Sequence, residues 1–366
     1  MHFLHVVGAR PNFMKVAPVL RALAARPGVV QTLLHTGQHY DANMSDIFFE
    51  QLGLPRPEIS LGVGSGSHAQ QTAQIMARFE EAVLARSPDW VLVYGDVNST
   101  VAAALVCAKL RIPVAHVEAG LRSFDRDMPE ELNRLVTDQL SDLLLTPSAD
   151  GDENLRREGI PAARIRCVGN VMIDTLVRLL PQARLPDAAL SSPFALVTLH
   201  RPSNVDEPET LRSILETLIE LSADCQMVFP VHPRTRRRIA DLGLTFPSPR
   251  QFLLLEPVGY LECLALQRSA LTVITDSGGI QEESTYLGVP CLTLRENTER
   301  PVTITHGSNQ LIGTDMDLLQ HEFRKVLNGQ GKRGRRPPLW EGRASERIAE
   351  ILLGGDAVVA PERRAA

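Results

Sequence analysis

The sequence contains little cysteine, few aromatic residues and no long apolar run. Its five cysteines are scattered over 366 residues without a Cys-x-x-Cys pair. This spacing argues against a disulfide framework or a zinc site and favours reduced, cytosolic thiols. No apolar segment approaches the roughly 18 residues needed to span a bilayer. We therefore expect a cytoplasmic protein with no metal site and no membrane partner.

The sequence also lacks an excess of positive charge. The formal net charge is −5 and the isoelectric point is near 6.1, which excludes nucleic acid as the expected partner. Residues 1–8 carry neither a basic leader nor a small-residue cleavage site, so they predict a first strand rather than a signal peptide. At 366 residues the chain exceeds the usual size of a single core, and two domains are expected.

Apolar runs alternate with amphipathic segments along the whole chain, a pattern typical of doubly wound α/β domains. Strands are expected at 3–7, 31–34, 90–94, 112–117, 143–145, 164–168, 194–199, 226–231, 251–255, 271–274 and within 287–294. Helical periodicity lies between most of these runs, including 44–52 and 69–85. We expect one domain over 1–170 and a second over 171–344. The Pro- and Ala-rich stretch 181–193 is expected to connect the two halves.

The stretch 275–284 predicts a nucleotide site. It places a Gly-rich turn between a strand and a helix, and a helix N-terminus favours phosphate through unpaired N–H groups and its dipole. Ser277 can donate a hydroxyl hydrogen bond, and Gly278 and Gly279 allow a diphosphate to approach closely. Glu283, two turns later, would better accept hydrogen bonds from a ribose. An ordinary tight turn is the alternative interpretation of this stretch alone.

Charged residues follow the expected strands of the first half. Arg10 and Lys15 follow the first strand at a helix start, where cations oppose the helix dipole and so indicate a bound anion. Asp96 and Glu118 follow two later strands, at the sheet edge where α/β proteins place their sites. Helix capping would explain either one singly. Glu130 begins the next helix, where a carboxylate is also favourable in itself.

The second half repeats this arrangement at its first strand, which ends in His200 and Arg201. These side chains are placed to meet an anion, although a buried and hydrogen-bonded histidine is the alternative. Two doubly wound halves with such strand ends predict a cleft between domains.

With these motifs assembled, the chain resembles the non-hydrolysing UDP-N-acetylglucosamine 2-epimerases. The matching stretches are 8–11 with Lys15, 95–96, 116–122, 129–134, 169–170, 200–201, 230–232, 276–283 and 298–301. The resemblance spans nearly the whole chain in order. It implies two Rossmann-like domains of the GT-B type, with the C-terminal helix 345–356 packing back on the first. It also implies a UDP-sugar substrate, a homodimer, and no need for a metal or for NAD.

The resemblance further implies a mechanism and a set of residues. Members of this family eliminate UDP to leave a 2-acetamidoglucal, and then add UDP back with the C2 proton delivered to the other face. The implied catalytic residues are Asp96, Glu118, Glu130 and His200, and which carboxylate removes the proton stays open. The implied UDP-sugar contacts are Arg10, Lys15, His200, Arg201, Val258, Ser277, Gly278, Gly279, Glu283 and Arg300.

Several positions depart from the pattern of many bacterial members. Residues 199–203 read Leu-His-Arg-Pro-Ser in place of Gly-His-Arg-Arg-Glu. Val258 and Cys263 replace Gln and Phe near the uracil, so base contacts there would be made largely by the backbone. Gln38-His39 matches only part of the motif that binds an activating second UDP-GlcNAc. The version at 199–203 also occurs in relatives that act on other 2-acetamido UDP-sugars, which leaves the substrate open.

Three other functions compete with this interpretation. A GT-B glycosyltransferase would need an acceptor pocket and would have less use for three carboxylates. A hydrolysing epimerase would release UDP and free N-acetylmannosamine. A nucleotide-sugar sensor would show no turnover.

Overall fold

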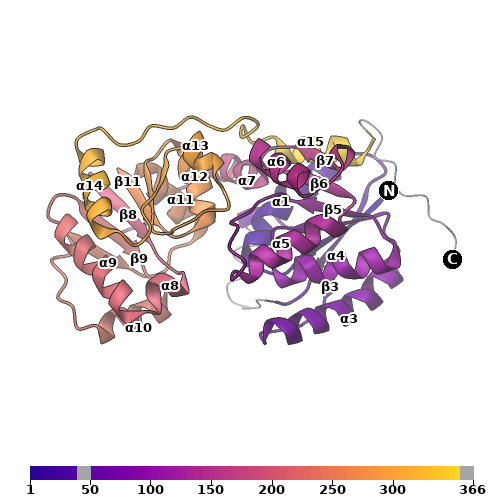
Figure 1. Cartoon of the computed structure of the whole chain (residues 1–366), viewed down its shortest axis with the longest axis horizontal. Helices are drawn as coiled ribbons and strands as arrows, with labels where there is room; N and C mark the ends of the chain where they lie inside the picture. The colour runs from indigo at the N-terminus through magenta and orange to yellow at the C-terminus, as the bar shows by residue number, and fades with distance from the viewer. Residues whose placement is uncertain (39–50, 355–366) are drawn as a thin grey trace. The chain divides into compact units, whose positions relative to one another are not determined.

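The computed structural model describes residues 1–38 and 51–354, with Arg10 described by its backbone alone. It divides into two compact units (Figure 1). Unit 1 joins Met1–Thr175 to the C-terminal segment from Pro338, and unit 2 comprises Leu176–Pro337. His39, most of the helix expected at 44–52 and the last two residues of the helix expected at 345–356 lie outside the described residues.

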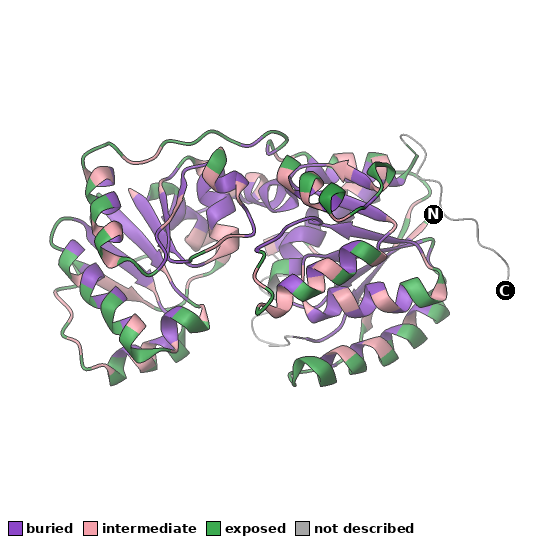
Figure 2. Ribbon diagram, viewed as in Figure 1, coloured by how far each residue is buried: buried purple, intermediate pink, exposed green. Residues whose placement is uncertain are grey.

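Unit 1 contains a parallel seven-stranded sheet in the order β3-β2-β1-β4-β5-β6-β7. Its strands are β1 (His2–Val7), β2 (Val30–His35), β3 (Ile59–Ser60), β4 (Trp90–Tyr94), β5 (Val114–Val117), β6 (Leu143–Thr146) and β7 (Ile165–Cys167). Its helices include α1 (Arg10–Ala24), α3 (His68–Arg86), α4 (Asn98–Leu110), α5 (Pro129–Leu140), α6 (Ala149–Arg157) and α15 (Ala344–Leu352). The central strands are buried throughout, as expected for a parallel sheet covered on both faces (Figure 2).

Unit 2 contains a parallel six-stranded sheet in the order β10-β9-β8-β11-β12-β13. Its strands are β8 (Phe194–Thr198), β9 (Gln226–Pro230), β10 (Phe252–Leu255), β11 (Thr272–Thr275), β12 (Cys291–Thr293) and β13 (Asn309–Leu311). Its helices include α8 (Pro202–Val205), α9 (Pro208–Leu221), α10 (Pro233–Asp241), α11 (Tyr260–Ser269), α12 (Gly278–Leu287), α13 (Val302–Thr305) and α14 (Met316–Leu327).

Successive residues of β8 belong to different hydrophobic clusters. Ala195 and Val197 pack in one cluster with α9 and α14 residues, whereas Phe194 and Leu196 pack in another with Leu266 of α11. Because side chains alternate across a strand, the two clusters lie on opposite faces of the sheet. Helices therefore cover both faces, and the predicted α/β class with two parallel sheets is confirmed.

In each sheet the strand order reverses at one point. The chain proceeds from β1 to β2 and β3 on one side and then returns to β4 on the other, and it makes the same reversal between β8 and β11. Ligands of open α/β sheets bind at the carboxyl ends of the strands beside such a reversal. In unit 1 the segments that follow these ends contain Lys15, after β1, and Asp96, after β4. In unit 2 they contain His200, after β8, and Ser277, after β11.

The structure corrects the connection expected at 181–193. The chain passes between the units inside α7 (Val171–Leu179), at Thr175, and 181–193 belongs to unit 2. Thr175 Oγ1 donates to Met14 O at 2.6 Å, which holds this end of α7 to α1. The 3₁₀ turn at Leu180–Gln182 packs on α11. The strands β3 and β13 were not predicted, because the sequence signal of a strand of two or three residues is weak. The 12-residue helix α14 was not predicted either.

Helix α15 packs on α1 within unit 1 and is held there by a buried carboxylate. Asp174 accepts hydrogen bonds from Ala344 N at 3.0 Å, Ser345 N at 2.7 Å and Ser345 Oγ at 2.6 Å. Burial raises the pKa of Asp174, and these donors act in the opposite direction. A carboxylate from α7 thus satisfies the first N–H groups of α15, as a capping residue would.

We expect Asp174→Ala to lower the free energy of unfolding of unit 1 by about 1–3 kcal/mol, because it leaves buried donors at the start of α15 unpaired. Urea unfolding followed by tryptophan fluorescence measures this, since Trp90 and Trp340 are both buried in unit 1. Glu346→Gln, an exposed change on the same helix, is the control and should fall within about 0.5 kcal/mol of wild type. Equal stability of all three proteins would contradict this role of Asp174.

Candidate active site

The site in unit 1 begins at the turn between β1 and α1. Asn12 Oδ1 accepts the N–H groups of Gly8 at 3.1 Å and Ala9 at 2.9 Å, and Asn12 Nδ2 donates to Tyr94 O at 2.8 Å. One buried amide therefore joins the carboxyl ends of β1 and β4. We did not select Asn12 from the sequence, although an Asn in the first turn of a helix is a recognisable local signal.

Lys15 forms a buried ion pair with Glu118, between Nζ and Oε2. Gly95, with φ 66°, lies against this pair. A Cβ atom at Gly95 would lie 2.7 Å from Lys15 Nζ and 3.2 Å from Glu118 Oε2, so the position requires glycine. Glu118 has φ 76°, which is rare for a residue with a side chain and costs backbone energy. Both members of this ion pair therefore belong to unit 1.

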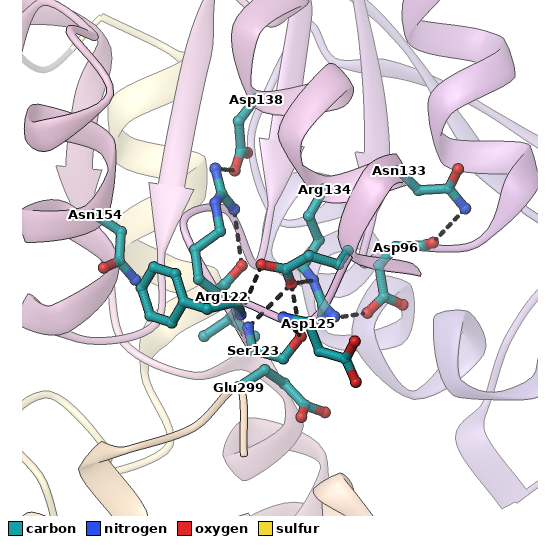
Figure 3. A network of polar contacts seen from close by, with 12 residues as sticks. Asp96, Arg122, Ser123, Asp125, Asn133, Arg134, Asp138, Asn154 and Glu299 are labelled. Atoms are coloured by element: carbon teal, nitrogen blue, oxygen red, sulfur yellow. Dashed lines mark hydrogen bonds and ion pairs between the residues drawn. The ribbon is translucent and has the colours of Figure 1, made fainter. Parts of the chain in front are cut away.

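Asp96 is held by the helix α5. Arg134 NH1 donates to Asp96 Oδ2 at 3.0 Å, and Asn133 Nδ2 donates to Asp96 O at 2.9 Å (Figure 3). Glu131 Oε2 lies 3.2 Å from Arg134 Nε and also accepts the N–H and the hydroxyl of Ser123, each at 3.0 Å. The Asp96 side chain keeps 28% of its surface exposed, so solvent or a ligand can reach it.

Glu130 lies in the first turn of α5 and is partly exposed. Its neighbour Glu131 is buried and accepts hydrogen bonds from the backbone of the 123–124 segment. Two adjacent glutamates therefore differ in their surroundings, since one is fixed inside the unit and the other can approach a ligand. The sequence alone did not separate them.

In unit 2 the buried carboxylate of Asp276 organises the end of β8. It accepts the N–H groups of His200 at 3.0 Å and Arg201 at 2.9 Å and the amide of Asn204 at 3.1 Å. His200 Nδ1 lies 2.8 Å from Asp276 Oδ1, while the His200 side chain remains 61% exposed. Burial acts to raise the pKa of Asp276, but the interactions with His200 and with both backbone donors bring that pKa below its ordinary value.

The N-terminus of α12 lies beside an arginine. Ser277 precedes the helix, and its own hydroxyl makes no capping hydrogen bond. A Cβ atom at Gly278 would lie 2.5 Å from Arg300 NH1, so glycine lets the guanidinium approach the first turn. Arg300 is held by ion pairs with Glu299 and, at 2.8 Å, with Glu282. The first turn of α12 and Arg300 together form an arrangement suited to an anion.

Glu283 is buried on the inner side of α12. Its carboxylate accepts hydrogen bonds from Tyr260 Oη at 2.8 Å and from Gln267 Nε2 at 2.7 Å. Burial raises the pKa of Glu283, and these two donors act in the opposite direction. Val258 is partly buried and packs against the cluster that contains Phe194.

The structure brings the selected residues together in two groups, one in each unit. Unit 1 groups Lys15 with Glu118, and unit 2 groups His200, Arg201 and Arg300 around the ends of β8 and β11. The residues that sequence reasoning missed are the buried partners Asn12, Glu131, Arg134, Asp276 and Glu282 and the half-buried Tyr260. Over residues 1–38 and 51–354, no cluster of three His, Cys, Asp or Glu side chains is arranged to hold a metal ion. No helix within those residues is long and apolar enough to cross a membrane.

We expect Asp276→Asn to destabilise unit 2 by about 1–3 kcal/mol at neutral pH, because the amide cannot accept all the hydrogen bonds of the carboxylate. The folded-state pKa of Asp276 lies below its ordinary 3.8, so its stabilisation is present above pH 3.8 and disappears as the pH falls through the folded-state value. Calorimetric unfolding from neutral to acidic pH should show the wild type and variant converging. Asp187→Asn, at an exposed position, is the control. A constant difference down to the lowest pH would contradict this assignment.

Known proteins match this chain over both units. Residues 21–353 match the family model for UDP-N-acetylglucosamine 2-epimerase. The UDP-N-acetylglucosamine 2-epimerase of Methanocaldococcus jannaschii is 42% identical over 96% of this chain and 98% of its own length. The UDP-2,3-diacetamido-2,3-dideoxy-D-glucuronate 2-epimerase of Pseudomonas aeruginosa is 44% identical over 96% of this chain and 99% of its own.

The crystal structure of the M. jannaschii UDP-GlcNAc 2-epimerase in complex with UDP-GlcNAc and UDP superposes with a TM-score of 0.88, covering 97% of this chain and all of that one. The two parallel sheets are thus those of the GT-B type. Both the family model and relatives above 40% identity extend over nearly the whole sequence. The chain belongs to the UDP-N-acetylglucosamine 2-epimerase family.

Proposed function

We propose that this protein is a non-hydrolysing UDP-N-acetylglucosamine 2-epimerase, an isomerase that interconverts UDP-GlcNAc and UDP-ManNAc. The observation that carries the proposal is the set of carboxylates at the ends of β4 and β5 and the start of α5, on a fold shared with the M. jannaschii UDP-GlcNAc 2-epimerase. In this elimination and re-addition the hydrogen leaves C2 and returns to it as a proton, never as a hydride, so the route uses no redox cofactor.

The chemistry requires acid and base groups near C2 and cations near the leaving UDP. Breaking the C1–O bond places positive charge on C1, which acidifies the C2 proton, and a carboxylate then removes it. Asp96, Glu118 and Glu130 are the proposed groups for this proton transfer. Lys15, beside Glu118, and the side chain of Arg10 would offset the charge of the diphosphate.

Unit 2 would hold the UDP. The first turn of α12, with Ser277, Gly278 and Gly279, offers N–H groups to the diphosphate, and Arg300 lies beside it. His200 and Arg201 would add charge-assisted hydrogen bonds to the leaving phosphate oxygen. Glu283 would accept a ribose hydroxyl, a role supported by the Tyr260 and Gln267 donors that already orient its carboxylate. The backbone near Val258 would contact the uracil.

We further propose that units 1 and 2 act as the two domains of one enzyme, that it is a homodimer and that it works in the cytoplasm. Within the described residues the five cysteines are unpaired, which supports a reducing compartment.

A second candidate substrate is a UDP-2,3-diacetamido-2,3-dideoxyglucuronate. The relative named for that sugar is 44% identical to this chain, as close as the relatives named for UDP-GlcNAc. The reaction at C2 would be the same, so the two candidates differ only at C3 and C6 of the sugar.

We expect the purified protein in D₂O, without added metal or NAD, to exchange the C2 proton of UDP-GlcNAc and to form UDP-ManNAc. Proton NMR follows both changes in one sample, and the diacetamido-glucuronate substrate is tested in parallel. Turnover of the second sugar alone would reassign the substrate. Free UDP with N-acetylmannosamine would mean a hydrolysing enzyme, and no reaction with either sugar would contradict an epimerase.

We expect Glu118→Gln and Asp96→Asn each to lower kcat by about 10²–10⁴-fold, because each change removes one proton-transfer group. Initial rates of UDP-ManNAc formation, normalised to folded protein, measure this loss. Glu153→Gln, an exposed carboxylate on α6, is the matched control and should retain wild-type rates. Activity within twofold of the control in either variant would remove that residue from the mechanism.

A further inference from the structure

A buried histidine joins the two strands that carry Asp96 and Glu118. His116 lies on β5, two residues before Glu118, and is completely buried. Its Nε2 lies 2.8 Å from Gly95 O, immediately before Asp96, and its Nδ1 lies 2.7 Å from Asp138 Oδ1 on α5. Because a carbonyl oxygen only accepts, Nε2 carries a hydrogen and donates it to Gly95.

Asp138 is ionised in this arrangement. Burial acts to raise its pKa, but His116 and Arg122 reverse that effect and bring the pKa below its ordinary value. Its second oxygen accepts from Gly120 N at 3.1 Å and lies 2.7 Å from Arg122 NH2 (Figure 3). Both ring nitrogens of His116 therefore face an acceptor, Nε2 the carbonyl of Gly95 and Nδ1 the carboxylate of Asp138.

The network continues outward from Asp138 through Arg122. Arg122 donates from Nε and NH2 to the two oxygens of Glu158, each at 2.7 Å. Arg122 therefore contacts two carboxylates, Asp138 and Glu158, and His116 contacts the first of them. Three of these side chains are almost completely buried, whereas Glu158 is 24% exposed, so the network runs from the end of β4 to the surface.

The inner end of the network terminates on the backbone beside both proposed catalytic carboxylates. Through His116 it fixes the carbonyl of Gly95, and through Asp138 it fixes the N–H of Gly120. Glu118 lies between these points with φ 76°, and Glu118 N and Ala119 N both donate to Leu145 O. A strained residue persists only where its surroundings hold it in place.

Stability alone does not require such an arrangement. Buried ions are often replaceable by apolar residues at no loss of stability, so a buried ionic network is weak evidence for a structural role. What distinguishes this one is where its hydrogen bonds end. They end at the backbone of Gly95 and Gly120. The side chains of Asp96 and Glu118 contact other residues, Arg134 and Lys15.

We propose that His116 and Asp138 are positioning residues that fix the separation of Asp96 and Glu118, and with it the face of C2 to which the proton is returned. This inference rests on the proposed function. After elimination the C1–O bond to UDP and the C2–H bond are both broken. Re-forming C1–O and adding a proton on one face restores the starting sugar, and adding it on the other gives the epimer.

The test uses the full chain with His116→Gln and Asp138→Asn, and with UDP-GlcNAc in D₂O. Two ratios are measured at early times: C2-deuterated starting sugar to C2-deuterated epimer, and free 2-acetamidoglucal to epimer. Both are independent of the amount of folded enzyme. We expect each variant to lose about 10²-fold in kcat and to shift at least one ratio by more than about threefold, as for a small misplacement of catalytic groups.

Glu158→Gln is the matched control, because it breaks the same network at its outer end and leaves His116, Asp138 and Gly120 in contact. It should lower thermal stability and leave both ratios at the wild-type values. Unchanged ratios in the His116 and Asp138 variants, with activity lost only in proportion to folded protein, would overturn the proposal.

Amide hydrogen exchange at residues 118–120 provides a reading that does not depend on turnover. Asp138→Asn should accelerate it more than Glu158→Gln does, since only the first leaves a single oxygen where Gly120 N and His116 each had their own acceptor. Equal exchange in the two variants would contradict the positioning role. If the wild type converts neither UDP-sugar, the proposed function is contradicted. The exchange rates of the two variants still test whether Asp138 positions residues 118–120.

Discussion

The ion pair between Lys15 and Glu118 is the interaction on which the unit 1 site depends. Both side chains are buried, and removing one partner of a buried ion pair costs about 3–5 kcal/mol, because it leaves the other charge uncompensated. The pair also accounts for two backbone features around it. Gly95 must be glycine to leave room for it, and Glu118 adopts a left-handed conformation that places its carboxylate against Lys15.

In unit 2 the buried carboxylate of Asp276 has a comparable role. This carboxylate lies at the end of β11 and holds the first residues after β8, the neighbouring strand. In unit 2 this carboxylate fixes the segment that follows the adjacent strand, whereas in unit 1 the ion pair joins α1, which follows β1, to the end of β5, two strands away. The exposed side chain of His200 and the partly exposed Asp96 then extend from a rigid base, which favours catalytic and binding precision.

These buried groups lie behind the residues that we propose to touch the substrate. Arg134 holds Asp96, Asp276 holds His200, and Glu282 and Glu299 hold Arg300. Membership of the UDP-N-acetylglucosamine 2-epimerase family gives the chemistry that such a set would perform. The family does not specify the substituents at C3 and C6 of the sugar, because two relatives of similar identity are named for sugars that differ there.

The local pattern of the sequence was sufficient for the order of most strands and helices. β4 was predicted at its observed bounds, 90–94, and the strand–turn–helix at 271–287 was predicted from its apolar run and glycines. It also directed attention to charged residues at the strand ends, because parallel α/β sheets place their sites there, and the roles of those residues stay predictions.

Only the tertiary structure decided the partners of those residues. Lys15 and Glu118 are 103 positions apart in sequence, Asp276 and His200 are 76 apart, and α15 is capped by Asp174 from 170 positions away. Periodicity and turn chemistry act over a few residues and specify which element forms. Which buried charge meets which other charge depends on how the elements pack, and that information exists only once the sheets are assembled.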